Sequence, residues 1–443
     1  MNLDDLILLQ DAPAQRGEQL GLNQKMLLKH RCDEFKALCS LKQIDPLELP
    51  NRARQITTSM NVLVPEWVLE ARAAATVAQV PAATMMAITS PPERIQPLLL
   101  PKRANDSTAF VASTTDSSAR TILLENCDGP EIPHYAISRG SSPGTLAYVA
   151  LAEAGDLGIK AFVNESGLAG TFHIGPQVED TTNAIPPSLV LRQIAERATN
   201  CAQAALEFES LQKRIGTGTP DRRGIIYLFA DSSGELLLLE ATATRCMHRR
   251  KADGHVIITN RMQLGTTSQS SIEANRHRCL REFLGNGPVN LRRTMNAACL
   301  DQKIGEEKGV CDTKTRASFI AVLGQGQIPG FALVTIGSPL CSLPFPLFPG
   351  TGVPRWLLDG SPFMTKLNAN NSRIRNEMDT RTEPPAAPTI PADKRSAYAD
   401  ILMKKLEAIQ SPHDPIAIAE MMREVAVLNR QFSELAPVPV KEP

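Results

Sequence analysis

The chain of 443 residues is poor in aromatic side chains and has no excess of either charge. Phe, Trp and Tyr make up 4% of it, but hydrophobic residues make up 42%, enough to bury the core of one large domain or two ordinary ones. Lys and Arg number 47, as do Asp and Glu, so the net charge is zero. Without a basic excess, no long-range field favours nucleic acid or an anionic membrane as a partner.

Long apolar runs and a basic leader are also missing. No run of about twenty apolar residues is present, as a membrane-spanning helix would require. Residues 1–5 (MNLDD) are acidic rather than basic, unlike the start of a secretory signal. The nine cysteines are odd in number and lack Cys-x-x-Cys pairs, which argues against a disulfide framework or a zinc ribbon. We therefore expect a reducing, cytoplasmic compartment.

Metal and nucleotide motifs are not found either. Metal-ligand spacing with Cys, Asp or Glu is missing around five of the histidines, which are His134, His173, His248, His255 and His277. The stretch 324–326 (GQG) lacks the rest of a nucleotide fingerprint and is typical of a turn. We expect no metal and no other cofactor.

The predicted elements run from helices through strands and a helix to more strands and helices. Apolar residues at helical spacing predict helices at 27–41 and 62–80, and a Pro-rich stretch at 90–102 follows them. Short β-rich runs predict strands at 148–152, 159–163, 224–230, 235–240, 255–259, 315–323 and 330–339, with a helix at 186–215 between the second and the third. Residues 271–284 predict a short helix whose basic cluster (Arg276, His277, Arg278 and Arg281) could bind an anionic substrate but is more typical of a solvated helix face. Two helices, 396–409 and 415–435, end the chain and could either mediate oligomers or dock on the body. This order predicts an α+β fold.

The most informative stretch is residues 104–129. In 104–111 (ANDSTAFV) an Asn-Asp pair meets a Ser-Thr pair just before an apolar, strand-like run. A second such run, 121–129 (TILLENCDG), ends in Asn-x-Asp, and the polar turn 115–118 between the two predicts a hairpin. One strand would begin at a hydroxyl residue, Ser107, and the other would end at Asp128.

This hairpin resembles the start of the mature chain in N-terminal nucleophile (Ntn) amide hydrolases. The closest branch is the acyl-coenzyme A:6-aminopenicillanic acid acyltransferase family (peptidase C45-like), which is related to the choloylglycine hydrolases. Further motifs follow in the family's order: Gly-x-x-x-Gly at 17–21, Asn-Glu-x-Gly-Leu at 164–168, Thr-Asn at 259–260, and an arginine at 316. Taken alone, 164–168 is equally typical of a plain β-turn.

The resemblance implies a chemistry. Members are made as precursors that cut themselves just before a Cys, and the new N-terminal residue attacks an amide or thioester. The matching peptide bond here joins Asp106 to Ser107, so Ser107 would be the nucleophile and its freed α-amine the general base. Four more site residues are carried over from the family: Asp128 to hold the α-ammonium or orient the nucleophile, Asn164 and Asn260 as oxyanion donors, and Arg316.

A serine at position 107 leaves several interpretations open. It could be a natural nucleophile, an engineered replacement of Cys that traps the zymogen, or the mark of a degenerate member that never undergoes autoproteolysis. The first predicts a self-processing hydrolase or acyltransferase that acts on a non-peptide linear C–N amide bond, with a small acyl amide or acyl thioester as substrate. The other two predict an inactive relative with a binding or structural role. An unrelated α+β enzyme would be favoured if Asn164 and Asn260 lay far from Ser107.

The resemblance covers residues 15–355 and implies the four-layer αββα sandwich of the Ntn hydrolases. Two antiparallel sheets would stack face to face with helices outside. The chain would then consist of a helical precursor segment (1–106), a catalytic domain (107–360), a linker (361–395) and a helical C-terminal extension (396–443). Nucleic acid and membrane are not expected as partners, whereas a homo-oligomer remains compatible with the extension.

Overall fold

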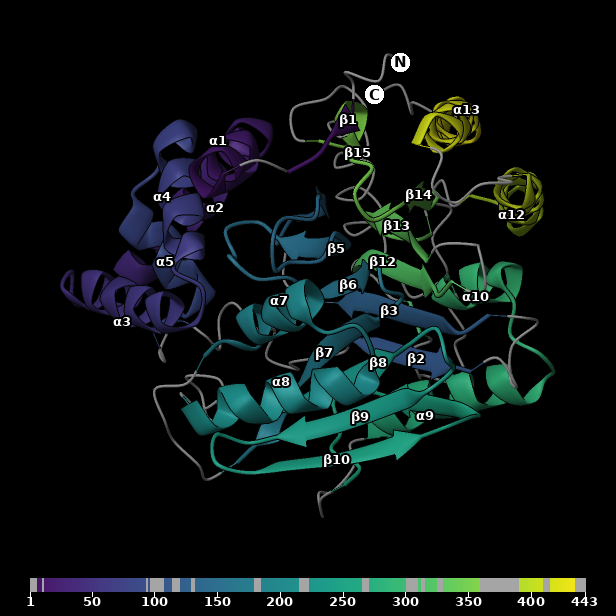
Figure 1. Cartoon of the computed structure of the whole chain (residues 1–443), viewed down its shortest axis with the longest axis horizontal. Helices are drawn as coiled ribbons and strands as arrows, with labels where there is room; N and C mark the ends of the chain where they lie inside the picture. The colour runs from purple at the N-terminus through teal and green to yellow at the C-terminus, as the bar shows by residue number, and fades with distance from the viewer. Residues whose placement is uncertain are drawn as a thin grey trace, which may run out of the picture.

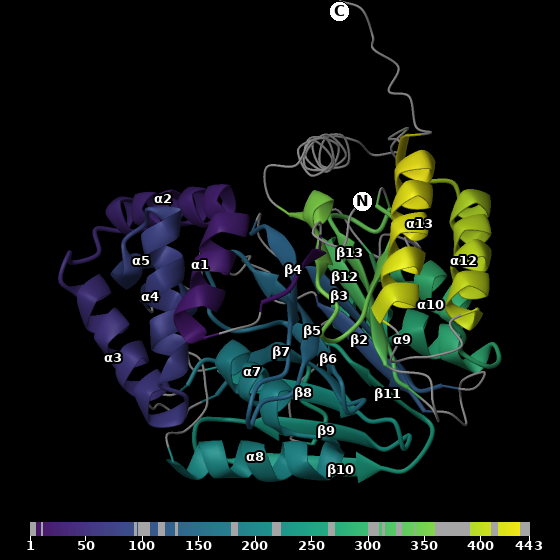
Figure 2. The ribbon, with the colours of Figure 1, turned by 45° about the horizontal axis from the view of Figure 1, so that its top comes forward.

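Two antiparallel sheets lie face to face at the centre of the computed structural model (Figures 1 and 2). The structure describes residues 6–9, 12–92, 95, 107–113, 120–128, 132–178, 185–214, 223–264, 271–299, 310–311, 315–324, 330–340, 342–358, 390–408 and 415–434. Within these ranges, no helix is both long and apolar enough to cross a membrane.

Each sheet has a simple antiparallel order. In the described residues, the six-stranded sheet runs β11 (His255–Ile258), β2 (Thr108–Ala112), β3 (Ile122–Asp128), β12 (Thr315–Val322), β13 (Phe331–Ile336) and β14 (Phe345–Leu347). The seven-stranded sheet, counted in the same way, runs β10 (Cys246–Lys251), β9 (Leu236–Ala241), β8 (Arg223–Ala230), β7 (Ala169–Gln177), β6 (Ala161–Asn164), β5 (Tyr148–Glu153) and β4 (His134–Arg139). A short pair joins β1 (Leu6–Ile7) to β15 (Val353–Pro354), and a 3-10 turn, η2, covers Arg355–Leu357.

Helices cover the outer face of both sheets (Figure 2). On the seven-stranded sheet they are α7 (Pro187–Arg197) and α8 (Cys201–Arg214). On the six-stranded sheet they are α9 (Ser271–Gly285), α10 (Leu291–Ala298), α12 (Ala392–Glu407) and α13 (Pro415–Glu434). The predicted α+β class is confirmed, and the helices and sheets form the expected αββα layers.

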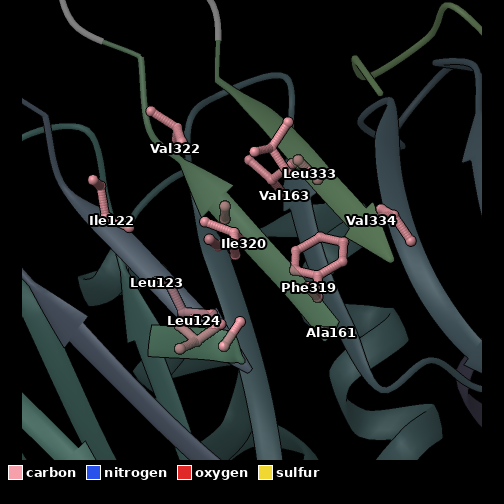
Figure 3. Close-up of a cluster of buried hydrophobic side chains, with 14 of the residues drawn as sticks. Ile122, Leu123, Leu124, Ala161, Val163, Phe319, Ile320, Val322, Leu333 and Val334 are labelled. Atoms are coloured by element: carbon pink, nitrogen blue, oxygen red, sulfur yellow. The ribbon is translucent and has the colours of Figure 1, made fainter. Parts of the chain in front are cut away.

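Aliphatic side chains fill the layer between the sheets. Ala161 and Val163 of β6 lie beside side chains of β12 and β13, among them Leu333 (Figure 3). Phe162, which lies between them in sequence, points the other way and packs on Phe229 in the core beneath α7. Because successive side chains of a strand alternate between its two faces, the face of one residue fixes the faces of its neighbours.

The N-terminal helices form a bundle beside the sandwich (Figure 1). They are α1 (Pro13–Asn23), α2 (Lys25–Leu41), α3 (Glu48–Leu63), α4 (Glu66–Ala78) and α5 (Ala82–Thr89). The Gly-x-x-x-Gly motif lies where α1 crosses α4: a Cβ on Gly17 would be 2.1 Å from the carbonyl oxygen of Glu70, and one on Gly21 would be 2.5 Å from that of Ala74. The two glycines therefore allow the helix backbones to touch.

Buried ion pairs join this bundle to the sandwich. The Arg192 guanidinium of α7 lies 2.8 Å from Glu70 of α4 and 3.0 Å from Glu196 of α7, which also pairs with Arg139 of β4. Arg16 of α1 approaches Glu70 at 3.4 Å. Burial raises the pKa of Glu70, but Arg192, Arg139 and Arg16 outweigh it and leave that pKa below its usual value. Glu70 of the bundle is therefore kept charged by arginines of both the bundle and the sandwich, and its ion pair with Arg192 joins the two.

Several boundaries differ from those expected. The predicted helix 186–215 is two helices, because α7 ends at Arg197 and α8 begins at Cys201. Helix α10 and strands β1, β4, β7, β10, β14 and β15 were not predicted. Helix α12 begins at Ala392, inside the expected linker 361–395, while the other proposed domain boundaries stay predictions. The C-terminal helices dock on the body, since Met422 and Val425 lie in the core, and whether they also mediate oligomers stays open.

Candidate active site

Ser107 lies immediately before β2, an interior strand of the six-stranded sheet, and is 4% exposed. Thr108 pairs with Asn126 on β3, and Ala109 pairs with Ile258 on β11. Continuing both registers towards the start of β2 places Ser107 between Cys127 on one side and Asn260 on the other. Asp106, the other residue of the proposed cleavage site, is outside the described residues.

The Ser107 side chain faces the layer between the sheets. Ala109 shares its face with Glu125, the residue opposite it on β3, and Glu125 reaches across to His173 on β7. Since side chains alternate along a strand, Ser107 has the same orientation as Ala109.

Asn260 belongs to this layer as well. It is 5% exposed, and its Nδ2 donates a hydrogen bond of 2.9 Å to the carbonyl oxygen of Ile174 on β7. That bond uses one of the two amide hydrogens. Continuing the register of β2 and β11 thus places Asn260 beside Ser107, and its second amide hydrogen has no partner among the described residues.

Asp128 lies at the same end of the sheet, but its side chain points outward, to the helical layer. Its Oδ2 accepts a hydrogen bond of 2.5 Å from Nη1 of Arg276 on α9, and its Oδ1 accepts one from the Thr315 hydroxyl. The same Nη1 donates to Oγ1 of Thr108 at 3.1 Å. Asp128 is therefore anchored next to the backbone that leads into Ser107.

Arg276 is the residue that sequence reasoning missed. It belongs to a basic run on α9 that is typical of a solvated helix face, and Arg278 and Arg281 are indeed exposed. Arg276 itself is 1% exposed and pairs with Asp128. Its place in the helical repeat was the available signal, because Cys279 and Leu280, three and four residues on, are also buried.

Arg316 lies at a bulge in β12, between Thr315, which pairs with Asp128, and Ala317, which pairs with Cys127. Cys127 in turn lies opposite Ser107 when the register of β2 and β3 is continued by one residue. Arg316 therefore reaches the same end of the sandwich as Ser107.

Asn164 is not part of this site. Its neighbour Val163 touches the position of Gly330, just before β13, and that end of the six-stranded sheet carries Ala112, the last residue of β2. At about 3.3 Å per residue, Asn164 is separated from Ser107 by roughly the length of β2, on the order of 15 Å.

The hydrogen bonds of Asn164 explain its presence. Its Nδ2 donates to the carbonyl oxygens of Ala195 and Ala198 at 3.1 and 2.8 Å, and its Oδ1 accepts from the Leu168 amide. No amide hydrogen is left for an oxyanion. The expected donor role is therefore corrected: Asn164 caps α7, and Gly167, with φ of +81°, closes a plain β-turn.

Cys127, opposite Ser107 on β3, offers no alternative nucleophile. Burial raises the pKa of Cys127 well above its usual value, and the charge of Glu125 adds to the effect. The thiol therefore stays protonated and unreactive. Among the described cysteines none forms a disulfide, and the described part of the chain holds no cluster of three or more metal-ligating side chains.

A comparison with known families agrees with the resemblance that the sequence motifs indicate. A model of the family described as acyl-coenzyme A:6-aminopenicillanic acid acyl-transferase matches residues 115–282. No curated protein sequence matches the chain.

Solved structures show distant similarity. An N-acylethanolamine-hydrolyzing acid amidase ortholog from Caenorhabditis elegans aligns at 13% identity and a TM-score of 0.35, over 48% of this chain and 92% of its own. Penicillin V acylase from Agrobacterium tumefaciens aligns at 13% identity and a TM-score of 0.38, over 54% and 86%. A variant of conjugated bile acid hydrolase from Clostridium perfringens aligns at 13% identity and a TM-score of 0.35, over 54% and 92%. The resemblance expected from the sequence is confirmed: residues 115–282 of the chain match the acyl-coenzyme A:6-aminopenicillanic acid acyl-transferase family.

Proposed function

We propose that the chain is a self-processing Ntn hydrolase or acyltransferase that cuts itself between Asp106 and Ser107 and then acts on a non-peptide linear C–N amide bond. The observation that carries this proposal is the place of Ser107. It stands at the start of an interior strand, faces the layer between the sheets and lies beside Asn260.

The first reaction is self-cleavage. The Ser107 hydroxyl attacks the carbonyl carbon of Asp106, an ester bond forms, and the C–N bond to Ser107 breaks. Water then hydrolyses the ester and leaves a carboxylate on Asp106 and a free α-amine on Ser107. That amine has a pKa of about 7.7–8.0 in model peptides, so a useful fraction is neutral near pH 7 and can act as the base in later turnovers.

The second reaction is acyl transfer from a small acyl amide or thioester. The Ser107 hydroxyl attacks the acyl carbon and gives its proton to the α-amine, and the second amide hydrogen of Asn260 stabilises the oxyanion. The α-amine passes the proton to the departing amine or thiol as the C–N or C–S bond breaks, which leaves the acyl group on Ser107 until an acceptor takes it. One such donor is worth about 3–4 kcal/mol in a measured case. Asp128 holds the α-ammonium from the other side of the strand, and Arg316 orients the substrate. Water as acceptor gives a hydrolase, and an amine as acceptor gives an acyltransferase.

A non-catalytic relative is the second candidate. Serine is a weaker nucleophile than the thiolate of the family, and Asn164 does not reach the site. On this alternative the chain is an uncut zymogen, trapped or degenerate, that keeps the fold for a binding or structural role. Self-cleavage separates the two.

Intact-mass analysis of the purified chain is the decisive measurement. We expect two fragments of about a quarter and three quarters of the chain, the larger one beginning at Ser107. Ser107→Ala should stay whole, and Ser107→Cys should split at least as fast as the parent. If neither the parent nor Ser107→Cys splits after Asp106, the alternative replaces this proposal.

Assays of the cleaved protein would then determine the substrate class. Acyl p-nitroanilides and acyl-coenzyme A thioesters would be supplied with and without an added amine. Faster consumption of the acyl donor together with acylated amine identifies an acyltransferase, and equal consumption identifies a hydrolase.

A further inference from the structure

A carboxylate and an imidazole meet in the layer between the sheets. Glu125 of β3 and His173 of β7 are both 0% exposed, and Oε2 of Glu125 lies 2.7 Å from Nε2 of His173. They join the two sheets at the centre of an apolar core. Burying two ionisable side chains costs desolvation free energy, which their pairing offsets only in part.

This pair lies beside the proposed nucleophile. Glu125 is opposite Ala109, and Cys127, which shares its face, occupies the row of Ser107. The second carboxylate oxygen of Glu125, Oε1, points towards that row, because it lies 3.7 Å from Sγ of Cys127. Successive rows on one face are about 7 Å apart, a gap that a Glu side chain closes directly or through one water.

His173 lies close to the proposed nucleophile as well. The next residue on β7, Ile174, accepts the hydrogen bond of Asn260, which flanks Ser107. The remaining ring nitrogen of His173, Nδ1, is buried and has no hydrogen-bond partner in the described part of the chain. A polar atom left in that state costs stability, so packing alone does not explain this imidazole.

Glu240, a second buried carboxylate among the described residues of this layer, serves a structural purpose. Glu240 of β9 accepts hydrogen bonds from the backbone amides of Gln263 and Leu264 and so fixes the chain after β11. Glu125 has no backbone donor of this kind among its described contacts, and its partners are His173 and Cys127.

Self-cleavage at a serine needs a base that the nucleophile cannot supply. In the precursor the amine of Ser107 is still part of a peptide bond, so it has no free electron pair with which to take a proton. A thiol, with a pKa of about 8.5, ionises readily near neutral pH, whereas a hydroxyl has to be deprotonated as it attacks. We propose that the Glu125–His173 pair is the proton acceptor for the Ser107 hydroxyl during self-cleavage. This inference rests on the function proposed above.

The proton balance closes within the site. The hydroxyl proton passes to the pair as the bond from Oγ to the Asp106 carbonyl carbon forms. The pair then gives that proton to the departing nitrogen of Ser107 as the C–N bond breaks. The pair returns to its starting state, and this acyl shift needs no oxidant or metal; water then hydrolyses the ester and completes the cleavage. Once the α-amine is free, it takes over as base, so the pair is needed for activation more than for turnover.

The test compares two substitutions in two backgrounds. Glu125→Gln and His173→Gln would be made in the parent and in Ser107→Cys, and the splitting of freshly made full-length chain would be followed by pulse-labelled cell-free translation and gel quantification. General acid–base catalysis contributes about 10²–10⁴-fold, so we expect splitting of the serine chain to slow by about 100-fold or more. In the cysteine background we expect less than about a tenfold change, because the thiol ionises without help.

His248→Gln is the matched control. His248 also faces a carboxylate, Glu209 at 3.9 Å, but on β10 at the outer edge of the other sheet. It should leave splitting unchanged in both backgrounds. Splitting of the cysteine versions also shows that the substituted chains fold.

Each other outcome overturns the inference. Equal slowing in both backgrounds would mean that the pair only supports the structure, and unchanged rates would mean that it plays no part. If the serine chain stays whole while Ser107→Cys splits, the pair is no working base for serine, although the Ntn assignment stands. If neither splits, the proposed function and this inference fail together.

Discussion

Replacing Arg276 by Gln should destabilise the protein far more than its place in a basic run suggests. Arg276 and Asp128 form an ion pair in which each side chain is 1% exposed. The substitution removes the cation and leaves the carboxylate buried. It also removes the hydrogen bond from Nη1 to Thr108, at the start of the nucleophile strand.

The magnitude follows from the burial of the pair. Breaking a fully buried ion pair by removing one partner costs about 3–5 kcal/mol. The hydrogen bond to Thr108 adds about 1 kcal/mol. The hydroxyl of Thr315 remains on the other carboxylate oxygen and offsets part of the loss. We therefore expect Arg276→Gln to lower the free energy of unfolding by about 3–4 kcal/mol.

Urea unfolding in the Ser107→Ala background measures this effect on an intact chain. Asp128→Asn and the double variant complete a cycle, and we expect a coupling of about 2 kcal/mol or more. Lys405→Gln is the control, because its pair with Glu424 lies on the surface and should be worth less than about 1 kcal/mol. A loss below about 1 kcal/mol for Arg276→Gln, or no coupling with Asp128, would refute the assignment of Arg276 as the anchor of this site.

Three further predictions concern the packing of the bundle and the sandwich, and one of them has a matched control substitution. Gly17→Ala places a Cβ 2.1 Å from the carbonyl oxygen of Glu70 and should cost about 1–3 kcal/mol in urea unfolding despite a better helix propensity. Gly285→Ala, with open space around it, should be neutral or slightly stabilising, and equal effects would contradict the close approach of α1 and α4. Burial raises the pKa of Asp156 from 3.8 to about 6, so the folded state binds its proton more tightly and stability falls as pH rises through that window. Asp156→Asn should therefore raise the free energy of unfolding relative to the parent by about 1 kcal/mol at pH 8, and by less or not at all at pH 4, and a gain independent of pH would exclude this cause. Asn164→Ala should cost about 2–3 kcal/mol in urea unfolding and leave self-cleavage unchanged, and slowed cleavage would return Asn164 to the site.

Local patterns were enough to predict the nucleophile hairpin. Residues 108–112 and 122–128 carry β-forming side chains around a polar turn, and such a signal needs only neighbours in sequence. The strand at 255–259 was predicted as well. That it pairs with β2 and so brings Asn260 beside Ser107 is a contact between residues about 150 positions apart, which no local pattern encodes.

Two errors at the site have the same origin. Asn164 occupies a motif that resembles the family's. Its sequence neighbours predict a turn, but they do not predict at which end of the sheet that turn lies. Arg276 belongs to a run of basic residues that is typical of an exposed helix face, but its own side chain faces the sheet and is buried against Asp128. In both cases the type of element was predictable, and the packing of one element on another decided the role of the side chain.

Strand geometry also explains why activation and turnover would use different bases. At the start of β2 the side chain of Ser107 points into the layer that holds Asn260 and Glu125, whereas Asp128 is anchored on the opposite face by Arg276. The backbone nitrogen of residue 107 lies in the plane of the sheet, between these two faces. While that nitrogen is an amide, a base for the hydroxyl has to come from the inner face. Once cleavage frees it as an amine, it is at hand for the hydroxyl, and the Asp128 carboxylate can balance its positive charge from the outer face. One strand would thus separate a base used once from a base used in every later cycle.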